Sequence, residues 1–580
     1  MPKATSRNGG GRSTVDRGGR LAHSASHAAR WVVRRRGALA RRLRAASPAP
    51  LRETDWRFLL PNPEGGAWNH VVLLGGSSEL PGLLIESGIA TRVSSEIPGE
   101  PSADALIVFR ERARDLKRAL TCLSPSGSVY AEIGGWVPGG RRRAERVRRM
   151  LKNVGLSRVR TYGIHPRLSR REAYVPLDAA GPATWFSENG LGGGASRRDL
   201  ALTAVGRNAE PGPSLLGHPA VRTRLESTES DVLVLTGGRV TDAFRRVVLL
   251  PFAPAARAPQ LVLKLWRSPE RNLDTLEEQR ILEQIRSVGA SGALGSVPEP
   301  LGSFRWGTLS VAAESYCPGR SFAARGPRRS AEDDRKLDDL RCVLSGLARF
   351  TGHAVIERKP WSAGDMGGRA EQALRTFEEQ FAPAPEEGML FEAVRDRSRS
   401  LSRESLPVVW SHPDLGPSNV LIRAEGITII DWARASPGWP LQDVLYFLLV
   451  AGFDICGARN ERERLEVFRR LFLEADSGDR LAAVAQEGVT RCLDAVGADR
   501  RFLPVLLVFL WVNRSLGRLA RSREVARGAA GVNAKEGNPY PAYVRVLAGR
   551  SGALLRRFEE PAGPPLPDRR SEAPGFPDDL

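Results

Sequence analysis

Two segments in the C-terminal half constrain this chain more than any other feature. Residues 408–422 read VVWSHPDLGPSNVLI, and residues 427–449 read ITIIDWARASPGWPLQDVLYFLL. The chain has only seven histidines, yet one of them stands two residues before an aspartate that is followed by an asparagine five residues later. An apolar, strand-like run then leads into a second aspartate, so two carboxylates and an amide are placed around short strands.

These polar residues fit the requirements of phosphoryl transfer, in which positioning and charge neutralisation supply most of the rate. Asp414 is predicted to accept the proton of a substrate hydroxyl, Asn419 to help hold Mg²⁺, and Asp431 to chelate the same metal. His412 is expected to support the loop, and its alternative role is that of an ordinary core histidine. The pattern therefore predicts a catalytic loop followed by a metal-binding strand end.

The string HPDLGPSN has the spacing of a protein-kinase catalytic loop, His-x-Asp-Leu-x-x-x-Asn. A protein kinase continues with Asp-Phe-Gly, whereas this chain has IIDWARA. The combination resembles the aminoglycoside phosphotransferase and choline kinase superfamily of small-molecule kinases, over roughly residues 216–550. Gly438, Pro440 and Asp443 stand where that family has a Gly-x-Pro-x-x-Asp segment. The resemblance implies a two-lobed α+β protein-kinase-like domain that uses ATP and Mg²⁺.

The upstream parts follow in the order that this fold demands. Lys264 is the only charge in the apolar strand QLVLKL and is predicted to bind the nucleotide phosphates. Glu278 lies in a helical segment at a suitable distance to pair with this lysine. Glu277 is the competing choice, but Glu278 shares a helical face with Leu282 and Ile285. A strand lysine whose ammonium reaches solvent is the alternative for Lys264.

Two further nucleotide contacts are expected. The segment LSVAAESYCPGRSF, at 309–322, is predicted to form the strand and hinge between the lobes, with backbone near Glu314 and Tyr316 facing the adenine. Gly237 and Gly238 are the candidate phosphate loop, although the chain has no G-x-G-x-x-G there and an ordinary hairpin turn fits equally well.

The N-terminal region alternates apolar strands with helical patterns, which predicts a parallel sheet covered by helices on both faces. The runs HVVLLGG and LTCLSPSGSVYAEI resemble the first strand and the Pro-Gly-turn strand of class I S-adenosylmethionine-dependent methyltransferases. The glycine turn has Gly75, Gly76 and Gly82 but no preceding acid, and Glu96 is the candidate ribose-binding acid of a shortened sheet. We expect a degenerate, non-catalytic α/β Rossmann-like domain.

Composition and linkers complete the expected organisation. Of the formal net charge of +20, the first fifty residues contribute +11, from Lys3 and eleven arginines against Asp16. The five cysteines are scattered without C-x-x-C spacing, which favours a reducing cytoplasm. The expected divisions are a basic tail (1–50), the Rossmann-like domain (51–185), a Gly/Pro-rich linker (186–215), the phosphotransferase domain (216–555) and a Pro-rich tail (556–580).

The basic tail has two interpretations. A helix with apolar residues on one side would bind an anionic membrane surface and make the protein peripheral there, whereas a solvated arginine-rich extension needs no partner. No helix-turn-helix or zinc finger accompanies the tail, so we do not expect nucleic-acid binding. No apolar run reaches the roughly 20 residues of a membrane span, and residues 502–512 and 444–453 are expected to be core helices.

Two functions are compatible with these residues. The first is an ATP-dependent phosphotransferase that acts on a hydroxyl of a small molecule, such as a sugar, an amino alcohol, an aminoglycoside or a biosynthetic intermediate. The second is a nucleotide-binding pseudokinase or scaffold, tethered by its basic tail to a membrane or glycan-assembly complex. The presence of Asp414, Asn419 and Asp431 together favours the enzyme.

Overall fold

The computed structural model describes twelve stretches of the chain. They are residues 51–61, 67–133, 140–165, 173–188, 199–206, 215–225, 231–236, 246–288, 297–323, 331–474, 478–526 and 537–552. The basic tail, the Pro-rich tail and the glycine pair Gly237–Gly238 lie outside these residues, so the predictions for them stay predictions.

The N-terminal region is built on four parallel strands in the order β2-β1-β3-β4. They are β1 (Trp68–Leu74), β2 (Ala90–Ser94), β3 (Ala103–Val108) and β4 (Leu123–Ile133). The helices in this region are α2 (Leu80–Glu86), α3 (Leu116–Ala119), α4 (Gly140–Asn153) and α5 (Ala180–Glu188). Apolar runs such as WNHVVLL are buried almost throughout, as parallel strands covered on both faces require.

The second half of this region departs from the expected parallel sheet. Strands β5 (Ser157–His165), β6 (Ala173–Pro176) and β7 (Asp199–Val205) pair antiparallel with their neighbours, and β7 lies between β4 and β5. The stretch 186–215 was expected to be a linker, but its residues 199–205 form β7. The Gly/Pro-rich composition around DLALTAV is typical of a linker, although the segment itself forms a strand whose first six residues are buried.

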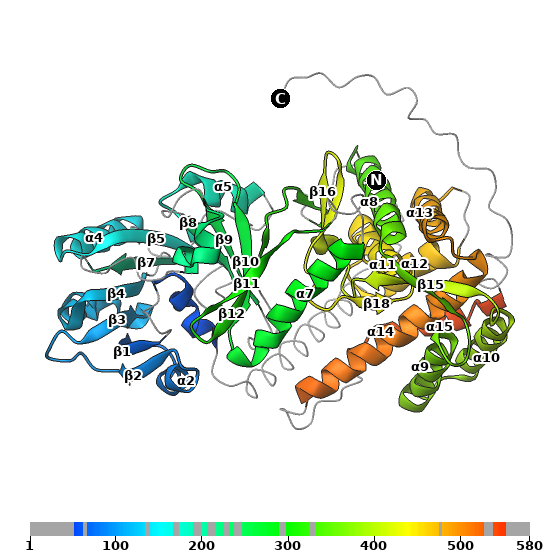
Figure 1. Ribbon diagram of the computed structural model, residues 1–580, viewed down its shortest axis with the longest axis horizontal. Coiled ribbons are helices and arrows are strands. Elements are labelled where there is room, and N and C mark those ends of the chain that lie inside the picture. The colour runs from blue at the N-terminus through cyan, green and yellow to red at the C-terminus, as the bar shows by residue number, and fades with distance from the viewer. Residues whose placement is uncertain are drawn as a thin grey trace, which may run out of the picture.

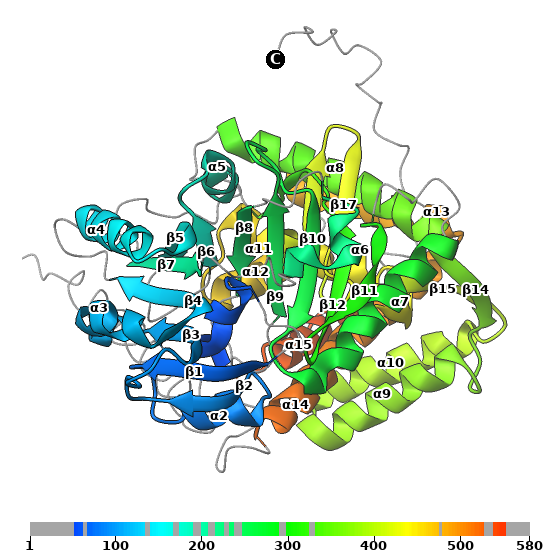
Figure 2. The same ribbon diagram turned by 60° about the vertical axis from the view of Figure 1, so that its left-hand side comes forward.

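A five-stranded antiparallel sheet follows, in the order β11-β12-β10-β9-β8. Its strands are β8 (Asp231–Leu235), β9 (Arg246–Phe252), β10 (Leu261–Trp266), β11 (Pro300–Trp306) and β12 (Leu309–Ser315). Helix α7 (Asn272–Val288) packs on β10, β11 and β12. Because β8 also pairs with β6, the strands of both regions form one twelve-stranded sheet, whose course can be followed in Figure 2.

The remaining chain is mainly helical, as expected from about residue 333 onward, and forms the second lobe in Figure 1. Its helices are α8 (Ala331–His353), α9 (Met366–Phe381), α10 (Pro385–Ser400), α11 (Gln442–Cys456), α12 (Glu461–Phe472), α13 (Arg480–Val496), α14 (Leu503–Ala526) and α15 (Tyr540–Ala548). Two small sheets complete it, β13 (Arg320–Ser321)-β16 (Val420–Arg423)-β17 (Gly426–Ile429) and β14 (Val355–Pro360)-β15 (Ser405–Ser411)-β18 (Ser436–Gly438).

Short helices connect these elements. They are α6 (Pro219–Arg222) and the 3-10 helices η1 (Leu51–Phe58), η2 (Arg110–Asp115), η3 (Leu120–Cys122), η4 (Leu215–Gly217), η6 (Pro269–Arg271), η8 (Pro417–Asn419) and η9 (Arg500–Phe502). Among them, η1 joins the two halves of the long sheet, because its Asp55 forms a fully buried ion pair with Arg267 at the end of β10.

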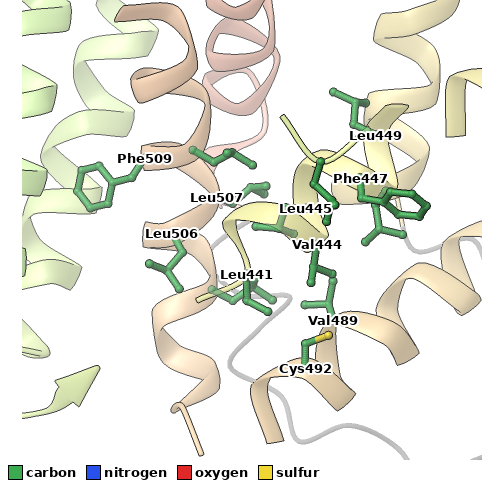
Figure 3. Close-up of a cluster of buried hydrophobic side chains, with 14 of the residues drawn as sticks. Leu441, Val444, Leu445, Phe447, Leu449, Val489, Cys492, Leu506, Leu507 and Phe509 are labelled. Atoms are coloured by element: carbon green, nitrogen blue, oxygen red, sulfur yellow. The ribbon is translucent and has the colours of Figure 1, made fainter. Parts of the chain in front are cut away.

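Among the described residues there are four hydrophobic clusters, and the two largest join distant parts of the chain. One spans the N-terminal region and the antiparallel sheet, and includes Trp56 and Val71 together with Leu263 and Val311. The other fills the helical lobe, where α11 and α14 bring their apolar side chains together (Figure 3). A core shared across the presumed domain boundary means that the N-terminal region and the first lobe are packed against each other as one body.

Helix α14 belongs to the second core along its first half. By length and composition, Arg500–Arg523 could cross a membrane, but 72% of its apolar window is buried inside the protein. Residues 502–512 are all buried, and residues 444–453 lie within the buried helix α11. Both segments are therefore core helices, as the sequence predicted.

Candidate active site

The catalytic loop begins where β15 ends, at Ser411. His412 follows and is buried, with its Nε2–H donating to the carbonyl oxygen of Ile430 at 3.0 Å. Its Nδ1 accepts the backbone N–H of Asp414 at 3.2 Å. These two contacts require the tautomer protonated on Nε2. His412 therefore connects the loop to the strand end that carries Asp431. This is the position that its predicted supporting role requires.

Asp414 is left exposed by this arrangement. Its backbone carbonyl accepts a hydrogen bond from Asn419 Nδ2 at 2.9 Å, and the backbone carbonyl of Asn419 accepts from the N–H of Ile430 at 2.9 Å. The main chain of the loop is thus fixed at both ends while the Asp414 carboxylate remains accessible. This is the geometry expected of a base that must meet a hydroxyl from solvent.

Asp443 fixes the start of the loop through two hydrogen bonds. It lies in the first turn of α11 and accepts hydrogen bonds from Ser411 Oγ at 2.8 Å and from the backbone N–H of His412 at 2.5 Å. Burial raises the pKa of Asp443, and the hydrogen bond from His412 opposes this rise. Gly438 permits the close approach, because a Cβ there would lie 2.9 Å from the Cβ of Ser411. The segment matched as Gly-x-Pro-x-x-Asp therefore buttresses the loop.

The predicted lysine–glutamate pair is present in the first lobe. Lys264 Nζ on β10 lies 3.2 Å from Glu278 Oε1 on α7. The competing residue, Glu277, is half exposed and pairs with Arg280 instead. Burial lowers the pKa of Lys264, but Glu278 and Glu314 outweigh it and hold the pKa above its ordinary value. The ammonium is therefore buried and charged, and not a strand lysine that reaches solvent.

Glu314 has a role beyond the expected one. We predicted only that backbone near this residue would face the adenine, but its side-chain Oε1 lies 2.6 Å from Lys264 Nζ. The two side chains share a face because Glu314 pairs with Val262, two residues before Lys264 in the antiparallel ladder. Lys264 is thus held between two carboxylates. Period-two alternation across β12 would have indicated this placement, had the strand register been known.

Arg246 is a site residue that sequence reasoning missed. Its Nη1 lies 2.5 Å from Glu278 Oε2 and 3.1 Å from Asp431 Oδ1. It starts β9 directly opposite Trp266, whose ring its guanidinium covers at 5.3 Å. In the sequence it is the second arginine of FRRVVLLPF, and only the pairing of β9 with β10 shows that it points at the site. Arg246 therefore links the two lobes.

Asp431 lies in the second lobe and contacts this cluster through Arg246. Its backbone has a φ of +68°, a conformation that few non-glycine residues adopt, and its side chain is 52% exposed. Partial burial raises the pKa of Asp431, but Arg246 and Lys264 outweigh this effect and hold it below the ordinary value. The next residue, Trp432, is buried and packs on the His412 ring at 5.0 Å, which fixes the strand end.

The hinge is in contact with the N-terminal region. Trp185 on α5 donates its Nε1–H to the hydroxyl of Tyr316 at 2.8 Å, and the two rings lie 6.3 Å apart. Helix α5 approaches closely, since a Cβ on Gly181 would lie 1.9 Å from the carbonyl oxygen of Ala256. Tyr316, expected beside the adenine, is thus positioned by a part of the chain that the sequence placed in a separate domain.

The second glycine turn, after β1, is arranged differently. Gly75 and Gly76 have φ values of +88° and +87°, which suit glycine alone. The N–H of Ser77 is already bonded to Glu53 Oε2 at 2.9 Å, and a Cβ on Gly76 would lie 2.9 Å from the Phe109 ring. Glu96, the candidate ribose-binding acid, follows β2 and is exposed. Side chains of the protein itself occupy the turn.

Asp431 and Asn419 offer oxygen ligands that suit a divalent cation. Asp431 offers a half-exposed carboxylate, and Asn419 offers its amide oxygen, since its Nδ2 faces the loop carbonyl. Among the described residues, no group of three or more His, Cys, Asp or Glu could hold a metal by itself. Mg²⁺ commonly takes one or two protein oxygens and completes its shell with phosphates and water. The donor set is therefore of the type that binds a metal together with a nucleotide.

Comparison with known proteins identifies the same region. Residues 251–484 match the model of the phosphotransferase enzyme family. No curated protein sequence matches the chain. Similar solved structures include a glucosamine kinase (16% identity, 61% of this chain and 87% of that one, TM-score 0.35) and a thermostable mutant of an aminoglycoside phosphotransferase (17% identity, 56% and 95%, TM-score 0.32). A macrolide 2'-phosphotransferase from Brachybacterium faecium shares 16% identity over 50% of this chain and 89% of that one, with a TM-score of 0.28.

The family match covers the paired Lys264 and Glu278, the catalytic loop and Asp431. It confirms the resemblance to small-molecule kinases that the motifs at 408–445 carried. The C-terminal region of this chain, over residues 251–484, is therefore similar to the phosphotransferase enzyme family.

Proposed function

We propose that this protein is an ATP-dependent phosphotransferase that acts on a hydroxyl group of a small molecule. One observation carries the proposal. The first lobe presents a buried, charged Lys264 held by Glu278, and the second presents an exposed Asp414 beside a half-exposed Asp431, with Arg246 joining the lobes. A purely structural ion-pair network would not leave Asp414 accessible at the end of a fixed loop.

The residues divide the work as follows. Lys264, oriented by Glu278 and Glu314, would bind the nucleotide phosphates, and backbone near Tyr316 would meet the adenine. Asp414 would orient the acceptor hydroxyl and take its proton as the new bond forms. Asn419 and His412 hold the loop main chain, so that the carboxylate of Asp414 keeps its position without reorganisation.

The proposed cofactor site lies at Asp431 and Asn419. A bound Mg²⁺ would supply charge neutralisation between the phosphate oxygens of ATP. Arg246 Nη1 lies 3.1 Å from Asp431 Oδ1, so Asp431 would hold the cation while its charge is also shared with this guanidinium.

The test is the metal dependence of nucleotide binding. Asp431→Ala should abolish the gain in ATP affinity that Mg²⁺ provides, because the metal loses a hard oxygen ligand. Isothermal calorimetry on the full chain with and without Mg²⁺ measures this gain. Asp396→Ala removes an exposed carboxylate on α10 that pairs only with a surface arginine and is the matched control. An unchanged Mg²⁺-dependent affinity in Asp431→Ala would contradict the assignment.

A further inference from the structure

The second half of α14 carries a stripe of arginines, and the first of them contacts α11. Arg514, Arg518 and Arg521 are spaced by four and three residues, which places them on one face of the helix. The residue between them, Gly517, leaves room on this face, and Arg521 Nη1 lies 3.8 Å from where its Cβ would be. The first half of α14 is buried in the core shown in Figure 3, so the stripe begins where the helix leaves that core.

Arg514 connects the stripe to the loop. The residue is only 9% exposed, and its guanidinium lies 3.3 Å from the centre of the Tyr446 ring. Tyr446 is on α11, three residues after Asp443, which accepts the backbone N–H of His412. Within the described part of the chain, Arg514 Nη2 is buried without a hydrogen-bond partner. A buried guanidinium with an unused donor costs free energy unless a ligand satisfies it.

The electrostatics show which groups surround this guanidinium. Burial raises the pKa of the Tyr446 phenol, Tyr540 adds to the rise, Arg514 opposes it and the charge on Asp414 adds to it. Arg514 and Asp414 thus both affect the pKa of one phenol. The position of Arg514 itself rests on its contact with Tyr446, one turn of α11 after the carboxylate that accepts from the N–H of His412.

Arg521, at the other end of the stripe, is affected by an arginine that follows the proposed metal-binding residue Asp431. Burial lowers the pKa of Arg521, and the neighbouring Arg518, Arg434 and Arg514 lower it further, against the opposing effect of Tyr540. Arg434 lies three residues after Asp431 and contributes to holding the pKa of that carboxyl down. Among the residues that the structure describes, none of these four arginines forms an ion pair with a carboxylate. Arg514 lowers the pKa of the buried Asp443 and Arg434 that of Asp431, while Arg518 and Arg521 have exposed side chains on the same face of α14.

These four arginines should disfavour the binding of a cationic acceptor. A polyamine sugar brought to Asp414 would be repelled by these arginines, whereas an anion would relieve their mutual repulsion and fill the donor capacity of Arg514. We propose that the acceptor carries an anionic group, a carboxylate or a phosphate, which Arg514, Arg518 and Arg521 bind while its hydroxyl lies at Asp414.

This proposal rests on the proposed function, and the chemistry of transfer is unchanged by it. The acceptor hydroxyl oxygen bonds to the γ-phosphorus of ATP, the bond from that phosphorus to the ADP oxygen breaks, and the hydroxyl proton goes to Asp414. The arginine stripe touches only the remote anionic group. Its interactions are the same in the ground state and the transition state, so they should lower KM without raising kcat.

The first experiment compares matched acceptors with the full chain. Glucuronate, glucose 6-phosphate, glucose and glucosamine present the same ring with an anionic carboxylate, a phosphate, no charge and a cation. Binding to the Mg-ADP-loaded protein is measured by calorimetry, and turnover by ADP release with Mg-ATP. We expect at least one acidic sugar to bind about tenfold or more tightly than glucose, with glucosamine the weakest. The proposal is wrong if neither acidic sugar binds more tightly than glucose.

The second experiment tests the stripe itself, using whichever acidic sugar binds best. Arg518→Gln and Arg521→Gln change exposed side chains and should leave folding intact. Each should weaken binding of the acidic sugar, and raise its KM where turnover is seen, by roughly 10-fold with kcat nearly unchanged. Arg523→Gln on the same helix removes an equal charge from a side chain that contacts Gln380, at 2.6 Å, and should change neither quantity. Equal losses in Arg523→Gln would show a diffuse charge effect and overturn the assignment.

The outcomes separate this proposal from the proposed function. A chain that fails to bind Mg-ATP would remove both. A chain that binds Mg-ATP and phosphorylates glucose or glucosamine as well as the acidic sugars would keep the phosphotransferase and remove only the anionic acceptor.

Discussion

The chain contains two loops of the kind that bind nucleotides or related cofactors, and they differ in what the fold has left available. After β1, the N–H of Ser77 is bonded to Glu53, and the Phe109 ring lies against Gly76. After β15, the loop main chain is equally well bonded, but the Asp414 carboxylate remains exposed. Glycines and strand ends alone therefore do not make a site. A site needs polar groups that the protein itself has not satisfied.

The same contrast explains how the two regions are joined. Polar groups of the N-terminal region contact the first lobe. These contacts include the Asp55–Arg267 pair and the hydrogen bond from Trp185 to Tyr316. Burial lowers the pKa of the adjacent Arg57 to about 10, against the opposing effect of Asp55. The region therefore resembles a structural support for the phosphotransferase more than a second catalytic unit.

The strongest test of this contrast is at Asp414. Asp414→Asn keeps the shape of the side chain but removes the charge that accepts the proton, so kcat should fall by about 10²–10⁴-fold. ATP affinity should change little, because Lys264, the hinge and Asp431 are the residues proposed to hold the nucleotide. Steady-state kinetics with an accepted substrate and calorimetry with ATP measure the two quantities. Near-native transfer by the variant would remove Asp414 from the mechanism.

The same variant also distinguishes an enzyme from a scaffold. If the native chain binds Mg-ATP but transfers phosphate to no acceptor of any charge, and Asp414→Asn behaves identically, the pseudokinase alternative becomes the better description.

The second test concerns the junction between the regions. Asp55→Asn leaves the guanidinium of Arg267 buried without its counter-ion, which should lower the free energy of unfolding by about 3–5 kcal/mol. Urea unfolding followed by tryptophan fluorescence measures the loss. Asp274→Asn breaks a partly exposed pair with Arg271, whose charged atoms are 3.2 Å apart, and should cost less than about 1 kcal/mol. Equal losses in the two variants would mean that the buried pair does not hold the junction.

A smaller effect is expected at the hinge. Trp185→Phe keeps an aromatic ring on α5 but removes the N–H that Tyr316 accepts, so ATP affinity should fall by roughly 2- to 12-fold. Thr184→Ala changes an exposed neighbour on the same helix and is the control. Unchanged affinity in Trp185→Phe would show that the N-terminal region supports the fold without positioning the nucleotide.

The smallest effect is predicted for the turn after β1. We expect S-adenosylmethionine to bind weakly or not at all, because Glu53 and Phe109 occupy the turn and no acid precedes it. Calorimetry on the full chain measures this directly, with Glu53→Ala as a variant that frees the Ser77 N–H. A micromolar affinity in the native chain would contradict the prediction and make the two loops alike.

Much of the site was predictable because its parts are local in sequence. Asp414, Asn419, Asp431 and Asp443 lie within thirty residues of one another, and their spacing specifies a loop between two short strands. Lys264 and Glu278 could be placed because each stands in a strongly patterned strand or helix. The division at 186–215 could not be predicted, since the composition around β7 is typical of a linker.

The sequence by itself determined the candidate catalytic loop, the lysine strand and the family that residues 251–484 resemble. Only the tertiary structure decided that β7 completes the N-terminal sheet, that Arg246 reaches Glu278 and Asp431, and that Trp185 contacts the hinge. It also decided that Arg514 of α14 lies against the ring of Tyr446, three residues after Asp443 on α11. Spacing along the chain determines which neighbouring residues can act together. Only strand register and helix packing determine which residues distant in sequence come into contact.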